Sequence, residues 1–160
     1  TNASIRTTTA STIINGGTKE NILPTKATAI INMRLLPGDT VEKAIEHIKK
    51  SVKDNTIKVS ALPYGYNATP VSPTNTKQFE LMQKTIKEIF PSALSAPYLV
   101  LGTTDARFYT ALSKNVYRFL PVHIDKDDLN RIHGKDERVS IENYKQLIRF
   151  YIQFIKNFNK

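Results

Sequence analysis

A proline-rich stretch near the middle of the chain constrains its fold more than any other feature. Residues 63–73 read PYGYNATPVSP, with three prolines and one glycine. Proline has no backbone N–H and a fixed φ angle, so neither a helix interior nor a central strand can run through this stretch. We interpret it as a linker between two parts, residues 1–66 and residues 67–160. A chain of 160 residues is long enough for two small lobes, each with a modest core.

The first part begins with two segments that have the pattern of β-strands. Residues 7–15 are rich in threonine and isoleucine and lead into the turn Gly16-Gly17. In residues 26–36, Ala29, Ile31, Met33 and Leu35 alternate with other residues, which is the period of a strand with one better-buried face. We therefore expect two strands joined by a turn.

A helix and a third strand are expected to complete the first part. Asp39 and Glu42 have the spacing of a helix-capping box, and His47 falls within the helix as a structural residue. The apolar residues that then share one helical face are Val41, Ala44, Ile45, Ile48 and Val52. Residues 57–61 return to strand alternation. The first part therefore reads as β-β-α-β with an antiparallel sheet.

The second part alternates helical and extended patterns. A helix ends before Pro91, and a long terminal helix begins near Ile141. Between them, residues 98–101 and residues 116–120 read as strands, while residues 125–138 read as a charged loop. We predict an α+β fold in which an α/β segment follows the antiparallel sheet.

Composition limits the possible functions. The formal charge is +9 and there is no cysteine, so disulfides are excluded and a transition-metal site must use His, Asp or Glu. The lysines are scattered along amphipathic segments, and no arginine-rich tract or aromatic RNA-binding motif occurs. We favour a solvated surface or attraction of anionic substrates over nucleic-acid binding, which stays the least favoured alternative. No apolar run has membrane-spanning length, and no targeting signal is present, so localisation stays open.

Two polar clusters are candidates for chemistry. In residues 102–107, the hydroxyls of Thr103 and Thr104, backbone N–H groups and Arg107 could hold a carboxylate. The alternative is that Thr104 or Asp105 caps a helix and Arg107 lies on the surface. In residues 131–138, His133 lies beside two acids and could bind a metal, although a histidine in a loop usually has no such role.

Six short motifs occur in a fixed order along the chain. They are residues 6–10 (RTTTA), 16–24 (GGTKENILP), 32–38 (NMRLLPG), 102–107 (GTTDAR), 117–121 (YRFLP) and 132–138 (IHGKDER). With these motifs the chain resembles, over nearly its whole length, the carboxypeptidase S, Gly-X carboxypeptidase and aminoacylase-like branch of a family of two-domain di-zinc metallopeptidases.

The resemblance implies a role for each part of the chain. Residues 1–66 would be part of a ferredoxin-like lid that forms a homodimer, and residues 67–160 the C-terminal segment of the catalytic domain. His133 would bind one zinc of a pair, and Asn21 and Arg34 would reach from the lid toward the substrate. Thr103, Thr104 and Arg107 would line the pocket for the carboxylate of a peptide or N-acyl amino acid.

The sequence departs from the family in what it lacks. We find no His-x-Asp motif, no Glu-Glu pair and no Gly-rich lid motif with a histidine. The other zinc ligands and the general base are therefore expected on the missing N-terminal part of the catalytic domain, a partner without which this chain is inactive. A stand-alone interaction module derived from the lid is the main alternative.

Overall fold

The structure is a computed structural model that describes residues 2–159. The chain forms two compact units. The first runs to Val71 and includes Leu101–Thr103, while the second contains Ser72–Val100 and the residues from Thr104 onward. The boundary between Val71 and Ser72 lies inside the proline-rich stretch.

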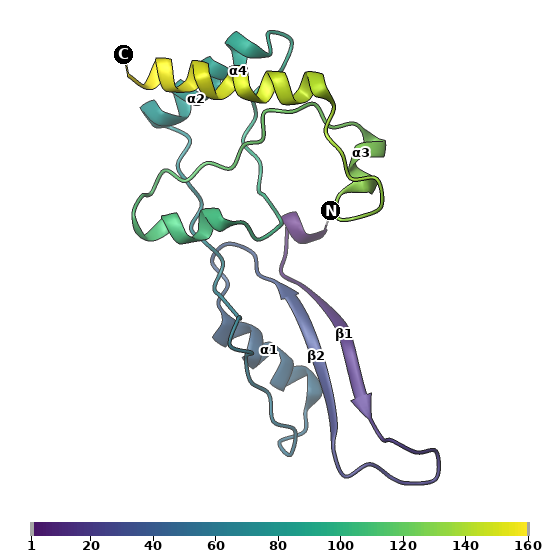
Figure 1. The fold of residues 1–160 in the computed structure, drawn as a ribbon. Helices are drawn as coiled ribbons and strands as arrows, with labels where there is room; N and C mark the ends of the chain where they lie inside the picture. Colours follow the sequence, from purple (N-terminus) through teal and green to yellow (C-terminus); the bar gives the residue numbers. More distant parts are fainter. Residues whose placement is uncertain (1, 160) are drawn as a thin grey trace. The chain divides into compact units, whose positions relative to one another are not determined.

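The first unit contains a β-hairpin made by strands β1 (Thr8–Gly16) and β2 (Ala27–Arg34), shown in Figure 1. The strands are antiparallel, with Thr8 opposite Arg34 and Gly16 opposite Ala27. The register shifts between Ser11 and Ile13, which is the signature of a β-bulge. Gly17 follows β1 with a φ of 79°, a left-handed conformation that glycine adopts without steric cost. The two expected strands are confirmed.

Helix α1 (Val41–Val52) follows the hairpin, as predicted, but its first turn is capped differently from our expectation. Thr40 is the N-cap residue, and its Oγ1 accepts a hydrogen bond from the Lys43 N–H at 3.3 Å. Asp39 instead accepts a hydrogen bond from the hydroxyl of Thr7. Because the carboxylate of Asp39 is engaged by the residue before β1, the neighbouring threonine takes the cap.

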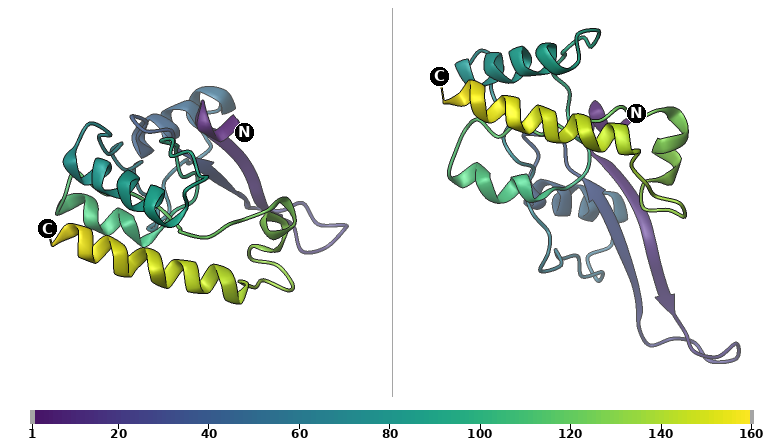
Figure 2. Two further views of the ribbon diagram at one scale, coloured as in Figure 1. Left: turned by 90° about the horizontal axis from the view of Figure 1, so that it is seen from above. Right: turned by 45° about the horizontal axis from the view of Figure 1, so that its top comes forward.

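The second unit is built on helices α2 (Lys77–Ile89) and α4 (Ile141–Phe158), which lie side by side in Figures 1 and 2. Both expected helices are confirmed. The buried residues of α2 are Thr85 and Ile86, and those of α4 are Phe150 and Asn157. Asn157 Nδ2 donates to Thr85 Oγ1 at 3.0 Å, so the buried polar groups of the two helices satisfy each other.

Three short helices lie outside this pair: η1 (Asn2–Ser4), η2 (Asp105–Ala111) and α3 (Lys126–Arg131). Our interpretation of residues 125–138 as a charged loop is wrong at its start, where α3 forms. Asp125 and Asp128 make a capping box, in which each side chain accepts from the backbone N–H of the other. This exchange satisfies two backbone donors at the helix start.

The predicted α+β class with an antiparallel sheet is confirmed, but three predicted strands are not formed. Among the described residues, the only sheet is the β1–β2 pair, so residues 57–61, 98–101 and 116–120 are not strands. Apolar alternation indicates an extended backbone, whereas a strand also needs a neighbour that accepts and donates ladder hydrogen bonds. These segments lack that neighbour in the described part of the chain, and the expected β-β-α-β order reduces to β-β-α.

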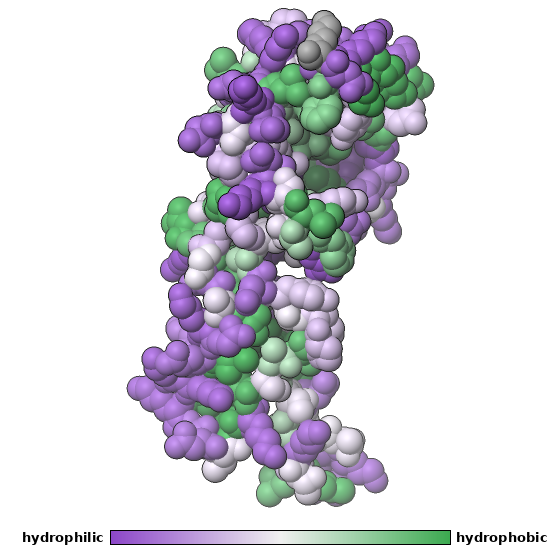
Figure 3. Space-filling model, turned by 90° about the vertical axis from the view of Figure 1, so that its left-hand side faces the viewer, coloured by the Kyte–Doolittle hydropathy of each residue, from purple (hydrophilic) through white to green (hydrophobic). Residues whose placement is uncertain are grey.

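Apolar side chains are abundant on the surfaces of both units, as Figure 3 shows for one face. Within residues 2–159, no helix combines the length and the apolar character that crossing a membrane requires. Ile14 on β1 is 76% exposed, and Leu23 in the connection between β1 and β2 is 92% exposed. Exposed apolar residues in such number are more than a small isolated domain usually carries, and large apolar surfaces commonly mark interfaces.

Candidate functional site

Asn21 lies in the connection between β1 and β2. It is exposed, and a turn is closed beside it by the Ile22 N–H, which donates to the Lys19 carbonyl at 3.5 Å. The next two side chains, Ile22 and Leu23, are also exposed. The hairpin therefore presents Asn21 on a protruding connection where it can reach another molecule.

Arg34 is the last residue of β2 and contacts the residue that precedes the 102–107 motif. Its Nη1 donates to the carbonyl oxygen of Leu101 at 3.1 Å. Leu101 and Thr103 belong to the same unit as the hairpin. The structure therefore brings Arg34 and the segment that carries Thr103 together, within the first unit.

Thr104 and Arg107 belong to the same 102–107 motif but lie in the second unit. Thr104 is the N-cap residue of η2, and its carbonyl accepts from the Arg107 N–H at 3.2 Å. The guanidinium carbon of Arg107 lies 4.6 Å from the centroid of the Phe108 ring, a distance that favours a cation–π contact. Arg107 is half-buried, so its charge is held near η2 instead of extending freely into solvent.

Thr104 does not cap η2 with its side chain, although the sequence made that the main alternative for this residue. Its backbone has the extended conformation of an N-cap residue, with φ of −133° and ψ of 165°. The side-chain oxygen instead accepts a hydrogen bond from Arg118 Nε at 3.3 Å. The hydroxyl of Thr104 is thus engaged by a basic side chain of the 117–121 motif, to which our sequence analysis gave no role.

His133 lies in a turn that follows α3. It is exposed and has a φ of 60°, the left-handed region that histidine enters more readily than most residues. The turn is closed by the Gly134 N–H, which donates to the Arg131 carbonyl at 2.8 Å. The imidazole is therefore accessible to a ligand that approaches from outside the chain.

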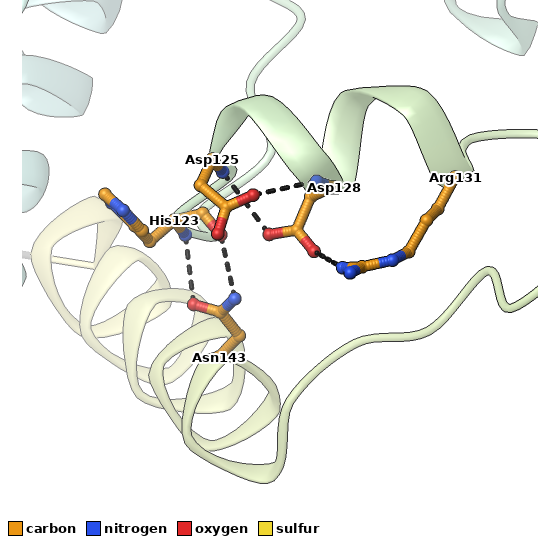
Figure 4. A network of polar contacts seen from close by, with 5 residues as sticks. All are labelled: His123, Asp125, Asp128, Arg131 and Asn143. Atoms are coloured by element: carbon orange, nitrogen blue, oxygen red, sulfur yellow. Dashed lines mark hydrogen bonds and ion pairs between the residues drawn. The ribbon is translucent and has the colours of Figure 1, made fainter.

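A network of polar contacts fixes the segment that leads to His133 (Figure 4). The amide of Asn143, in the first turn of α4, accepts from the His123 N–H at 3.0 Å and donates to the His123 carbonyl at 2.8 Å. Arg131 Nη1 then contacts Asp128 Oδ1 at 3.0 Å. Backbone N–H donation from Asp128 lowers the pKa of Asp125, with smaller contributions from nearby positive groups. α3 and its capping box are thereby tied to α4.

The described residues do not assemble a metal site by themselves. Within residues 2–159, no group of three or more His, Asp or Glu side chains could hold a metal ion. Structural zinc takes about four protein ligands and catalytic zinc about three. His133 therefore belongs to no such group within residues 2–159.

The comparisons with known proteins agree with the motifs. Residues 2–60 match the model of the peptidase dimerisation domain of M20 proteins. The chain is 44% identical over 155 residues to a probable carboxypeptidase S-like protein of Dictyostelium discoideum, covering 97% of this chain and 30% of that protein. Residues 2–60 thus form an M20 peptidase dimerisation domain, and nearly the whole chain is similar to carboxypeptidase S-like proteins.

Other M20 proteins match over the same length. The human N-fatty-acyl-amino acid synthase/hydrolase PM20D1 is 39% identical over 160 residues, covering 98% of this chain and 32% of that protein. Carboxypeptidase S of Saccharomyces cerevisiae is 30% identical over 186 residues. The chain therefore spans about a third of the length of these M20 relatives.

A solved M20 structure has the same fold. The M20 family metallo-carboxypeptidase of Sulfolobus solfataricus aligns with a TM-score of 0.73 at 16% sequence identity. The alignment covers 98% of this chain and 36% of that protein. At this identity the likeness is one of fold, and it extends over both units.

Proposed function

We propose that this chain is part of a metallohydrolase that cleaves an amide bond next to a free carboxylate in peptides or N-acyl amino acids. The observation that carries the proposal is the similarity over 97–98% of the chain to proteins named as carboxypeptidases or as an N-fatty-acyl-amino acid synthase/hydrolase. The substrates that these names describe share an amide bond beside a terminal carboxylate. A site that binds this carboxylate would therefore suit both peptides and N-acyl amino acids.

Thr103, Thr104 and Arg107 are the residues that we propose for carboxylate recognition. A guanidinium presents several N–H donors in a fixed fork that matches a carboxylate, and such charge-assisted hydrogen bonds are stronger than neutral ones. Stacking on Phe108 holds the Arg107 guanidinium and reduces the entropy that binding would cost. Arg34 and Asn21 are proposed to act from the lid, with Arg34 supporting the segment at Leu101.

His133 is proposed as one ligand of a zinc pair. Zinc bound in such a site polarises a carbonyl oxygen and lowers the pKa of a bound water. Because residues 2–159 form no complete ligand group, the other ligands and the general base are proposed to come from the N-terminal part of the catalytic domain. We assign His133 no role beyond holding metal from the turn between α3 and α4.

One face of α4 is apolar and exposed, which favours a further part of the protein packing against it. The apolar side chains on this face are each at least 43% exposed and recur at spacings of three and four residues, which places them along one side of the helix. They are Ile141, Tyr144, Ile148, Tyr151, Ile155 and Phe158. We propose that the missing catalytic segment packs there.

We also propose that the dimerisation domain, whose two-stranded sheet is small and exposed, forms a homodimer.

Carboxylate recognition can be tested in the longer protein that contains this chain. Arg107→Met should raise KM for an N-acyl amino acid by about tenfold or more, since a charge-assisted hydrogen bond contributes roughly 1.5–3 kcal/mol. The variant should not change KM for the corresponding methyl ester, which carries no carboxylate charge. Arg149→Met is the matched control, because Arg149 is exposed on α4 and its nearest carboxylate contact is 3.9 Å long. An equal effect on acid and ester would refute the assignment.

A further inference from the structure

Arg118 lies in residues 115–120, an irregular segment whose neighbouring residues are firmly held. Ser72 Oγ accepts from the Val116 N–H at 3.0 Å and donates to the Val116 carbonyl at 2.9 Å. The hydroxyl of Tyr117 donates to the Pro73 carbonyl at 2.7 Å. Both residues before Arg118 are therefore fixed to the start of the second unit.

The residue after Arg118 is anchored as well. The Phe119 ring packs against Phe150, with 5.1 Å between centroids, and Phe150 is 3% exposed. The backbone at Arg118 is thus held on both sides by contacts within the second unit. This fixes where the Arg118 side chain begins, whereas its rotamers are restricted by its own contacts.

The contact that Arg118 makes determines how the hydroxyl of Thr104 can be used. A guanidinium donates hydrogen bonds but accepts none, so Thr104 Oγ1 must be the acceptor of the 3.3 Å bond from Arg118 Nε. The hydroxyl hydrogen of Thr104 is then available to an acceptor other than Arg118. A hydroxyl that accepts from a cation is also a stronger donor, because neighbouring hydrogen bonds polarise one another.

This contact also explains why Thr104 does not cap η2. A threonine at the N-cap position ordinarily accepts from a backbone N–H two or three residues later. Here the oxygen faces Arg118, and the cap hydrogen bond is absent. Arg118 therefore selects one orientation of the Thr104 side chain over the usual capping orientation.

We propose that Arg118 is a positioning residue of the carboxylate-binding segment: it holds Thr104 so that the threonine hydroxyl donates to the carboxylate of the substrate. This proposal rests on the proposed function of Thr104 and Arg107. Arg118 acts through Thr104, and its positive charge adds attraction for the anion. The dependence on Thr104 separates this role from a general contribution to stability.

The test is a titration of the 160-residue chain with sodium propionate, followed by ¹⁵N NMR at the backbone amides of Thr104 and Arg107, with sodium chloride at equal ionic strength as the blank. Arg118→Gln should weaken propionate binding about tenfold, the size expected for one charge-assisted hydrogen bond. It should also move the Thr104 side chain to the capping rotamer, measured by three-bond couplings. Thr104→Val should weaken binding similarly, whereas Thr104→Ser should not.

The matched control is Arg149→Gln, which removes the same charge from the exposed side of α4 and should leave binding unchanged. The proposal would be overturned if the Arg118→Gln variant kept the propionate affinity and the Thr104 rotamer of the wild type. If Arg118→Gln fails to fold, equal affinities of Thr104→Val and Thr104→Ser would overturn it instead. A wild-type chain that shows no propionate response at these amides would refute the proposed carboxylate site itself, which is a distinguishable result.

Discussion

The buried amide of Asn157 offers a sharp test of how the second unit is held together. Asn157 is 6% exposed, and its Nδ2 donates to Thr85 Oγ1 at 3.0 Å and to Glu88 Oε2 at 2.8 Å. Asn157→Asp keeps the shape of the side chain but replaces this donor by a carboxylate oxygen that faces Glu88. The Thr85 hydroxyl cannot compensate without losing its own bond to the Leu81 carbonyl.

The expected cost is about 3 kcal/mol of unfolding free energy. A neutral hydrogen bond contributes roughly 1 kcal/mol and one to a charged group roughly 1.5–3 kcal/mol, and the new repulsion between carboxylates adds to their loss. The assay is urea unfolding followed by far-UV circular dichroism, which reports the helices α2 and α4. In acid the cost should shrink, because an ordinary Asp carboxyl becomes neutral below a pH of about 3.9.

The matched control is Asn159→Asp, the same change two residues later, where the side chain is exposed at the C-cap of α4. Its cost should stay below about 1 kcal/mol, the usual size of an unfavourable charge near a helix end. If the two variants lose equal stability, the polar contacts between α2 and α4 do not stabilise the unit as argued here.

Two further predictions concern the chain alone. The 160-residue chain should hydrolyse no N-acyl amino acid or dipeptide above background even with added zinc, because residues 2–159 hold no complete metal site. Steady-state assays with zinc and with a chelator check this prediction. Chelator-sensitive turnover would contradict it. Acid should fray α3: the pKa of Asp125 lies below its ordinary 3.8, so its cap contributes stability above that pH and loses it as the pH falls through the lower folded value. The protection factors of the α3 amides against hydrogen exchange should then fall in acid more than those of α2, and an equal fall in both helices would show that the cap does not stabilise α3.

The helices and the hairpin could be predicted because their signals are local. The periods of apolar residues indicated α1, α2 and α4, and alternation with Gly16-Gly17 indicated β1 and β2. Residues 57–61 and 98–101 carry equally clear apolar patterns and form no strand in the described chain. A strand depends on a partner that is distant in sequence, and the pattern of one segment does not contain that partner.

The details of the candidate site depended on tertiary contacts in the same way. The choice of Thr40 over Asp39 as the cap of α1 follows from the position of Thr7, which no local pattern reveals. The contacts of Asn143 with His123 and of Arg118 with Thr104 were missed because they join segments 20 and 14 residues apart, although Arg118 lies in the 117–121 motif. α3 could have been found, since Asp125 and Asp128 have the spacing of a capping box with Asp in place of the usual Glu.

The metal role of His133 is the central claim, and metal content tests it most directly. In the longer protein that contains this chain, His133→Ala should reduce bound zinc, measured by plasma mass spectrometry, and should reduce amide hydrolysis in the same preparation. His47→Ala is the matched control, because His47 is exposed on α1 and should change neither quantity. Unchanged zinc stoichiometry in His133→Ala would contradict the assignment of this chain as a ligand-bearing part of the metallohydrolase.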